Sequence, residues 1–123
     1  SALAGIWGNT TSLTGGDGIF VRGAGLVDVG YNNVTLAGDD GIDVQDAALV
    51  RVHDNFVAGT LDNGIEASNV FLSSIDNNFV GGTIGNGIDL RDSGLVTIDN
   101  NAVVGTVGHG IFVDPSFLIN VSN

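Results

Sequence analysis

Cysteine, lysine and methionine are absent from this sequence of 123 residues, and proline occurs once. Without cysteine the chain cannot form disulfides, zinc–thiolate centres or a thiol nucleophile. Three arginines stand against 14 aspartates and glutamates, which gives a formal net charge of −11. This charge repels nucleic acid and anionic membranes, so we expect neither as a partner. No apolar run is long enough to span a bilayer, so we expect no membrane insertion.

Glycine is abundant instead, with 20 residues, and five of them precede an isoleucine at a constant interval of 23 residues. These pairs begin at Gly18, Gly41, Gly64, Gly87 and Gly110. Leucine recurs at the same interval, at Leu3, Leu26, Leu49, Leu72, Leu95 and Leu118. A column of valine and isoleucine contains Ile6, Val29, Val52, Ile75, Ile98 and Val121. A fixed period of this length indicates a solenoid with one structural unit per repeat.

Each repeat contains three short apolar stretches separated by turn residues, for example 41–45, 48–52 and 56–59. They are too short for helices and rich in β-branched residues, which favours strands. The sequence therefore predicts an all-β fold, a parallel β-helix of about five coils of 23 residues with three short strands per coil. We expect the Gly-Ile isoleucines, the leucine column and the valine/isoleucine column to point inward. Because Leu49 and Val52 are three residues apart, both can do so only if a corner or bulge lies near Leu49.

Asparagine also recurs in register, at Asn9, Asn32, Asn55, Asn78 and Asn101. Equivalent residues of a parallel stack lie about 4.8 Å apart. An amide both donates and accepts hydrogen bonds, so stacked asparagines can bond along the column. A sharp turn between strands often requires a left-handed backbone, which asparagine tolerates. We therefore predict a structural asparagine ladder in one turn.

The stretches NGIDL and LVTIDNN, within residues 86–101, resemble the right-handed parallel β-helix repeats of the pectate-lyase-like superfamily. The resemblance covers essentially the whole chain and implies right-handed coiling. The superfamily includes polysaccharide lyases, hydrolases and epimerases, phage tailspikes and adhesin stalks, so the fold alone does not give the function. In its enzymes the sheet equivalent to the Gly-Ile strands lines the substrate cleft.

Three carboxylates, Asp43, Glu66 and Asp89, face outward on this predicted sheet in neighbouring coils. At about 5 Å apart they repel by roughly 1–3 kcal/mol for each neighbouring pair. Solvent and Arg91 could offset the repulsion, calcium could bind the acids, or one carboxyl could keep its proton for acid–base chemistry. Asp43, Glu66 and Asp89 are thus a candidate calcium site and, with Arg91, a candidate glycan- or ion-binding site. The lyases that the chain resembles often use a basic residue as catalyst, which implies Arg91 as a catalytic candidate.

A second set of catalytic candidates lies just before the Gly-Ile pairs. The pair Asp39–Asp40 and the stretch Gly108–Gly110 are similar to motifs of polygalacturonases, which use paired aspartates for inverting hydrolysis. The resemblance implies Asp39 and Asp40 as catalytic residues and His109 as a helper. However, three coils separate His109 from Asp40, or roughly 14 Å at the strand spacing. Aspartate and asparagine are also expected as turn residues before a strand.

Phe56 and Phe79 form an outward apolar column if the valines that follow them point inward. An exposed apolar strip on an acidic rod indicates packing against neighbouring coils or another chain. Alternatively, the rings could fold over the turn and cover the end of the core.

The repeats do not differ in length, and their turns are short, whereas enzymes of this superfamily usually build clefts from long irregular loops. We therefore predict a non-enzymatic rod that requires no cofactor: a stalk, adhesin or fibre segment of an extracellular or cell-surface protein. Residues 1–123 would then be a segment of a longer β-helix. The alternative is a carbohydrate-active or glycan-binding module that binds a polysaccharide on the acidic face, with calcium as its candidate cofactor.

Overall fold

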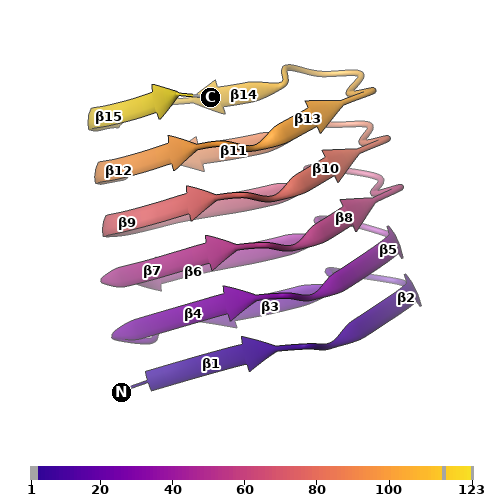
Figure 1. Ribbon diagram of the computed structural model, residues 1–123, viewed down its shortest axis with the longest axis horizontal. Helices are drawn as coiled ribbons and strands as arrows, with labels where there is room; N and C mark the ends of the chain where they lie inside the picture. The colour runs from indigo at the N-terminus through magenta and orange to yellow at the C-terminus, as the bar shows by residue number, and fades with distance from the viewer. Residues whose placement is uncertain (1–2, 115, 123) are drawn as a thin grey trace.

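The computed structural model describes residues 3–114 and 116–122. These residues form fifteen β-strands and no helix, so none of them lies in a helix long and apolar enough to cross a membrane. The chain winds as a parallel β-solenoid of about five turns. Figure 1 shows the coils stacked from the N-terminal coil at the bottom to the C-terminal coil at the top.

Each full coil contributes to three sheets, named here by their outward side chains. The leucine sheet contains β1 (Leu3–Trp7), β4 (Leu26–Gly30), β7 (Leu49–His53), the second half of β9 (Ile65–Asp76), β12 (Gly94–Asp99) and β15 (Phe117–Ser122). The phenylalanine sheet contains β2 (Thr10–Thr14), β5 (Asn33–Ala37), β8 (Phe56–Ala58), β10 (Phe79–Gly81) and β13 (Ala102–Val104). The acidic sheet contains β3 (Ile19–Arg22), β6 (Ile42–Ala47), the first half of β9, β11 (Ile88–Arg91) and β14 (Ile111–Val113). Strand β9 joins the acidic and leucine sheets because it runs through their shared corner without a break.

Every strand pairing is parallel and joins residues 23 positions apart, for example Leu3 with Leu26 and Ile42 with Ile65. The predicted period, strand direction and number of coils are therefore confirmed. In-register pairing stacks like side chains on one another, which is why whole columns of the sequence share one residue type.

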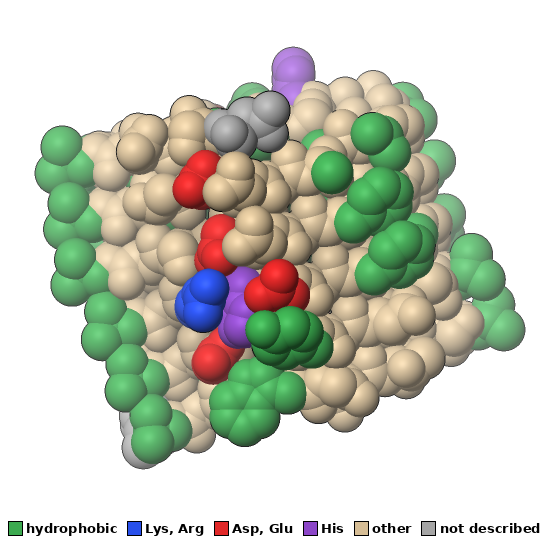
Figure 2. All heavy atoms as spheres, in the orientation of Figure 1, with side chains coloured by type: hydrophobic (Ala, Val, Ile, Leu, Met, Phe, Trp, Pro, Cys, Tyr) green, Lys and Arg blue, Asp and Glu red, His purple; other side chains and the backbone are tan. Residues whose placement is uncertain are grey.

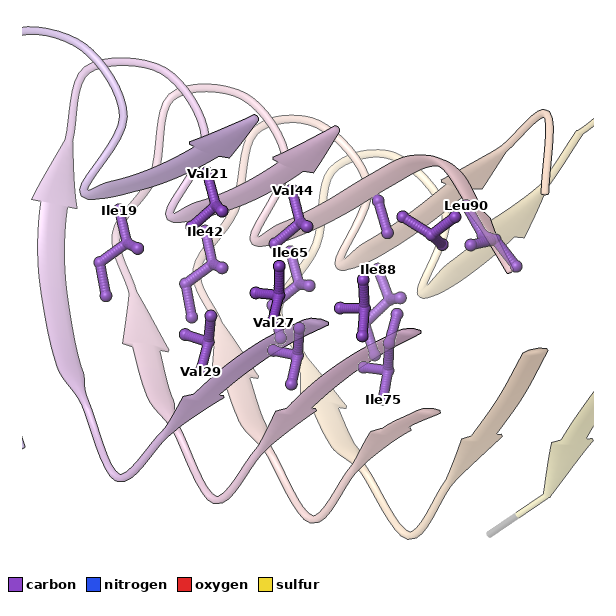
Figure 3. Close-up of a cluster of buried hydrophobic side chains, with 14 of the residues drawn as sticks. Ile19, Val21, Val27, Val29, Ile42, Val44, Ile65, Ile75, Ile88 and Leu90 are labelled. Carbon is purple, nitrogen blue, oxygen red and sulfur yellow. The ribbon is translucent and has the colours of Figure 1, made fainter. Parts of the chain in front are cut away.

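The core lies between the three sheets, where inward residues of successive coils stack. Figure 3 shows Ile42, Ile65 and Ile88 from the acidic sheet pointing toward Val29 and Ile75 from the leucine sheet. All five side chains are buried. Burying one such side chain stabilises the fold by about 1.5–3 kcal/mol. No single coil can enclose these residues, so each coil depends on its neighbours.

The leucine column does not point into the core, and this part of the prediction is wrong. Its members are between 41% and 76% exposed, and they form a hydrophobic column along the left edge in Figure 2. The following residue points inward instead, as in Val50, so simple alternation also brings Val52 inward. Leu49 lies in the regular pairing of β4 with β7, so the corner or bulge predicted there is absent. Leu72 and Leu95 have positive φ angles, but their strands keep a one-to-one register on both sides, so neither residue is the extra residue of a bulge.

The asparagine ladder forms as predicted. Asn32 Oδ1 accepts hydrogen bonds from the backbone nitrogen and Nδ2 of Asn9, at 2.9 and 3.1 Å. Asn32 Nδ2 donates to Asn55 Oδ1 at 3.0 Å and to the carbonyl of Ile6 at 2.9 Å. The same pattern continues through Asn55, Asn78 and Asn101. The left-handed backbone belongs to the residue before each ladder asparagine, as in Asp54 (φ 54°), and not to the asparagine itself.

Candidate functional site

The acidic sheet positions its outward side chains by simple alternation along each strand. The isoleucine that begins a strand points inward, so the next residue points outward. The outward column pairs in register and contains Phe20, Asp43, Glu66, Asp89 and Phe112. Asp43 and Asp89 are nonetheless only 5% and 0% exposed. Two of the predicted site residues are therefore buried carboxylates, which require partners or protons.

A second ladder runs through the turn that precedes the acidic sheet. The side-chain oxygen of each turn residue accepts the backbone N–H of its equivalent in the next coil, at 2.8–3.0 Å. The ladder contains Asp17, Asp40, Asn63, Asn86 and His109. Aspartate and asparagine suit this position because both present an acceptor oxygen to the next coil. The ladder also holds these side chains beside the outward column.

The acids predicted as one row each have their own partners. Asp89 accepts two hydrogen bonds from Arg91, at 2.9 and 3.0 Å, and a third from Asn86 Nδ2 at 3.2 Å. Glu66 Oε1 accepts a hydrogen bond from Asn63 Nδ2 at 2.8 Å. Asp89 and Arg91 thus form a bidentate ion pair, the strong form of a charge-assisted hydrogen bond.

Asp43 belongs to a different group of carboxyls, at the N-terminal end of the acidic sheet. Oxygens of Asp17, Asp40 and Asp43 lie within 4.8 Å of one another. Asp40 also belongs to a second trio of this kind, with Asp39 and Asp62. Clustered carboxylate oxygens are the ligands that calcium and magnesium prefer. In these two trios of described residues the carboxylate oxygens lie close enough together to hold a divalent cation, and calcium at Asp43, Glu66 and Asp89 stays a prediction.

The pKa values of this cluster are displaced upward. Burial, followed by the nearby charge of Glu66, raises the pKa of Asp40 to about 8, although the N–H of Asn63 opposes the shift. Burial and the same Glu66 charge raise the pKa of Asp43 to about 7. Burial also raises the pKa of Asp17. The cluster therefore holds protons near neutral pH, or it needs a cation to replace them.

Of the other catalytic candidates, Asp39 and Asp40 lie together in one trio, and His109 lies apart from them. Asp39 is exposed, and Asp40 is buried beside it. His109 lies at the far end of the turn ladder, with Asn63 and Asn86 between it and Asp40. It is exposed, and its ring stacks on Phe112 with the centroids 5.3 Å apart.

Arg91 lies at the same end of the sheet as His109. Its guanidinium carbon is 5.6 Å from the centre of the Phe112 ring, and its Nε and Nη2 atoms donate hydrogen bonds to Asp89. The predicted base therefore faces the acid of its own strand and has no contact with the Asp39–Asp40 pair.

Sequence reasoning missed Asp17 as a member of the acidic cluster. The signal was present, because Asp17 precedes Asp40 by 23 residues and Asp43 follows Asp40 by three. Asp17 and Asp40 belong to the turn column and Asp43 belongs to the strand column. Only a comparison of the two columns shows that these acids lie close together in neighbouring coils.

Phe56 and Phe79 point outward on the phenylalanine sheet and stack in parallel, with ring centroids 5.0 Å apart and an interplanar angle of 6°. The valines that follow them are fully buried, which agrees with the predicted alternation. Figure 2 shows hydrophobic side chains gathered over this sheet, to the right of the charged residues. The rings are 43% and 37% exposed, so they form a surface strip and do not cover the end of the core.

Comparison with known families agrees with this architecture. Residues 2–123 match the family described as the right-handed β-helix region, so the chain belongs to that family. The resemblance seen in the repeats is thereby confirmed at the level of the right-handed β-helix. No curated protein and no solved structure matches the chain.

Proposed function

We propose that this chain is a non-enzymatic structural rod: a stalk, adhesin or fibre segment of an extracellular or cell-surface protein. The observation that carries the proposal is the constant register, since every strand pairing joins residues 23 positions apart. No described coil therefore adds a loop that could wall a cleft. An enzyme has to exclude water and position its substrate, and equal coils provide no such enclosure.

Bonds between side chain and backbone tie each coil to the next along the axis. The asparagine ladder and the turn ladder do so at two corners. At a third corner, Ser73 Oγ accepts the N–H of Val50 at 3.0 Å, and Ser93 Oγ accepts the N–H of Val70 at 3.1 Å. A rod under tension along its axis would distribute the load over all three corners. Its negative surface would keep neighbouring rods apart in solution.

The mechanical role can be tested by pulling the chain from its two ends with optical tweezers. We expect it to resist forces at which a helical-bundle control extends, and to lengthen in steps of one coil. Asn32→Ala, which removes a buried ladder amide, should lower the unfolding force, because it removes the acceptor of the Asn9 backbone N–H and the donor to the Ile6 carbonyl. Asn33→Ala, at the exposed neighbouring position, is the matched control and should not. Extension of the wild type at the force of the helical control would contradict the proposal.

A carbohydrate-active or glycan-binding role on the acidic sheet, like that of the pectate-lyase-like enzymes, is the second candidate. The raised pKa of Asp40 favours it. A carboxyl that holds its proton near neutral pH can act as a general acid, and an ionised neighbour can act as the base. In this role Glu66 and Arg91, which reach the surface, would contact the polysaccharide, the buried Asp43 and Asp89 would lie behind them, and calcium would bind the clustered carboxylates.

A thermal melt with millimolar calcium, and with a chelator, separates the two candidates. The second candidate predicts that calcium raises the melting midpoint of the wild type and not that of Asp43→Asn. Asp89→Asn is the matched control, because its carboxylate is already paired with Arg91. Incubation with polygalacturonate, assayed for unsaturated and reducing ends, completes the test. Product that forms with the wild type and not with Asp40→Asn would overturn the rod proposal.

A further inference from the structure

A groove on the outer face of the leucine sheet has no role in either function proposed above. It has a volume of about 550 Å³ and crosses the first four coils. The exposed leucine column forms one wall. The floor presents one outward residue from each strand: Gly5, Asp28, Arg51 and Ser74. Figure 2 shows this face, with the hydrophobic column at the left and the charged side chains next to it.

Trp7 places its indole ring across the floor of this groove, over Gly5. A Cβ atom at Gly5 would lie only 2.5–3.0 Å from three carbons of the six-membered ring, so the glycine allows the ring to rest against the strand. Trp7 is nevertheless 58% exposed. An aromatic ring that is supported by the backbone and open to solvent offers a flat apolar face to a ligand.

The two charged residues of the floor are held in place by partners outside it. Arg51 donates to Asp76 through Nε at 3.3 Å and through Nη2 at 3.0 Å. Asp28 Oδ1 lies 2.6 Å from Nε2 of the buried His53. Both side chains remain about half exposed, so their other donors and acceptors are accessible. Polar groups that are already fixed lose little conformational entropy when a ligand binds.

The charges on and around the groove indicate what kind of ligand fits. Arg51 is neutralised by Asp76, and the whole chain carries a net charge of −11. A polyanion or a second copy of this chain would therefore be repelled. A neutral polymer with apolar C–H faces and many hydroxyls complements an aromatic face beside fixed hydrogen-bonding groups. Strands about 4.8 Å apart present these groups to successive units of such a polymer.

We propose that this groove binds a neutral linear polysaccharide along the axis of the β-helix. Trp7 stacks on one sugar ring, and Asp28 and Arg51 bond the hydroxyls of the units that follow. The site is separate from the acidic sheet. It goes beyond the rod role because it gives the rod a specific adhesive surface.

The single tryptophan of the sequence reports directly on this groove. The intact chain is titrated with cellohexaose, xylohexaose and mannohexaose, and with an oligogalacturonate as the anionic comparison, while tryptophan fluorescence is recorded. We expect a saturable change with at least one neutral oligosaccharide and none with the oligogalacturonate. Absence of any saturable change, or stronger binding of the oligogalacturonate, would overturn the proposal.

Calorimetry with variants locates the binding. Trp7→Ala should weaken it by roughly tenfold or more, the scale of losing a central aromatic contact. Trp7→Phe should retain most of the affinity, and Arg51→Gln should weaken binding. Phe20→Ala, an exposed aromatic of the acidic sheet, is the matched control and should bind as the wild type does. Affinity that survives Trp7→Ala, or is lost in Phe20→Ala, would contradict the assignment, and circular dichroism melts verify that each variant is folded.

Discussion

Asp43 and Asp89 occupy the same outward position of the acidic sheet, two coils apart, and both are buried. Asp89 is bound by the guanidinium of Arg91 and by the amide of Asn86. At the positions equivalent to these two partners, Asp43 has Gln45 and the acid Asp40. One region therefore contains a neutralised ion pair, and the other contains a cluster of carboxyls with raised pKa values.

The comparison shows that the backbone geometry of a coil does not decide the protonation of a buried carboxyl. The residue two places along the strand is Arg91 beside Asp89 and Gln45 beside Asp43, and only the arginine supplies a positive charge. At Asp43, burial and the charge of Glu66 raise the pKa. Because the two coils share one backbone, we expect an exchange of the residue at this position to change the state of the carboxyl.

The carboxyl cluster of Asp17, Asp40 and Asp43 should make the stability of the protein depend on pH. The pKa of Asp40 is raised to about 8 and that of Asp43 to about 7, both from 3.8, so between about pH 4 and 8 the folded state binds more protons than the unfolded state. The free energy of unfolding should therefore fall by several kcal/mol as pH rises through this range, since each unit of pKa shift corresponds to about 1.4 kcal/mol. Urea denaturation from pH 4 to 9 measures it. Asp40→Asn should reduce the slope, and Asp40→Asn combined with Asp43→Asn should flatten the profile; a slope that persists in the double variant would show that other groups cause it.

Removal of Arg91, the cation that pairs with Asp89, should have the next largest effect on stability. Arg91→Leu leaves the carboxylate of Asp89 buried without its ion-pair partner. We expect a loss of about 2–3 kcal/mol at pH 7, less than for a fully enclosed pair because Arg91 is half exposed. Chemical denaturation measures the loss. Arg22→Leu, which removes an ion pair on the exposed surface of the same sheet, is the control and should change stability little.

Placing a cation beside Asp43 should have the smallest effect, and it should raise stability instead of lowering it. Gln45→Arg places a guanidinium where Arg91 stands beside Asp89, two residues along the strand from Asp43. The pKa of Asp43 should fall from about 7, and stability at pH 7 should rise by about 1 kcal/mol. NMR titration of the Asp43 carboxyl, together with denaturation, tests both expectations. An unchanged Asp43 titration would mean that burial and the charge of Glu66, and not the missing cation, maintain the raised pKa.

The fold could be predicted from the sequence to a large extent. The Gly-Ile pairs and the asparagine column recur every 23 residues, and only in-register parallel stacking gives equivalent residues equivalent surroundings. The orientation of the leucine column could not be predicted in the same way. Leu49 and Val52 were compatible with a bulge or with an outward leucine. Val50 is buried in the core, so Leu49 beside it points outward.

The candidate site was only partly predictable. Asp43, Glu66 and Asp89 were recognised as a column, and their register is as expected. Their partners come from other columns and other coils, so the sequence alone did not show that Asp17 and Asp40 approach Asp43. In the same way, nothing in the spacing of Trp7 and Gly5 required the ring to lie across the glycine.

The period, the parallel register, the asparagine ladder and the excess of negative charge follow from the amino-acid sequence, because each is a property of one column or of the composition. The packing of the coils was needed to show which carboxyls lie close together, which acid pairs with an arginine, and which side of the coil the leucines occupy. These outcomes depend on distances of a few ångströms between side chains from different columns. The repeats of the sequence show each column, but they do not show which side chains of different columns come into contact when the coils stack.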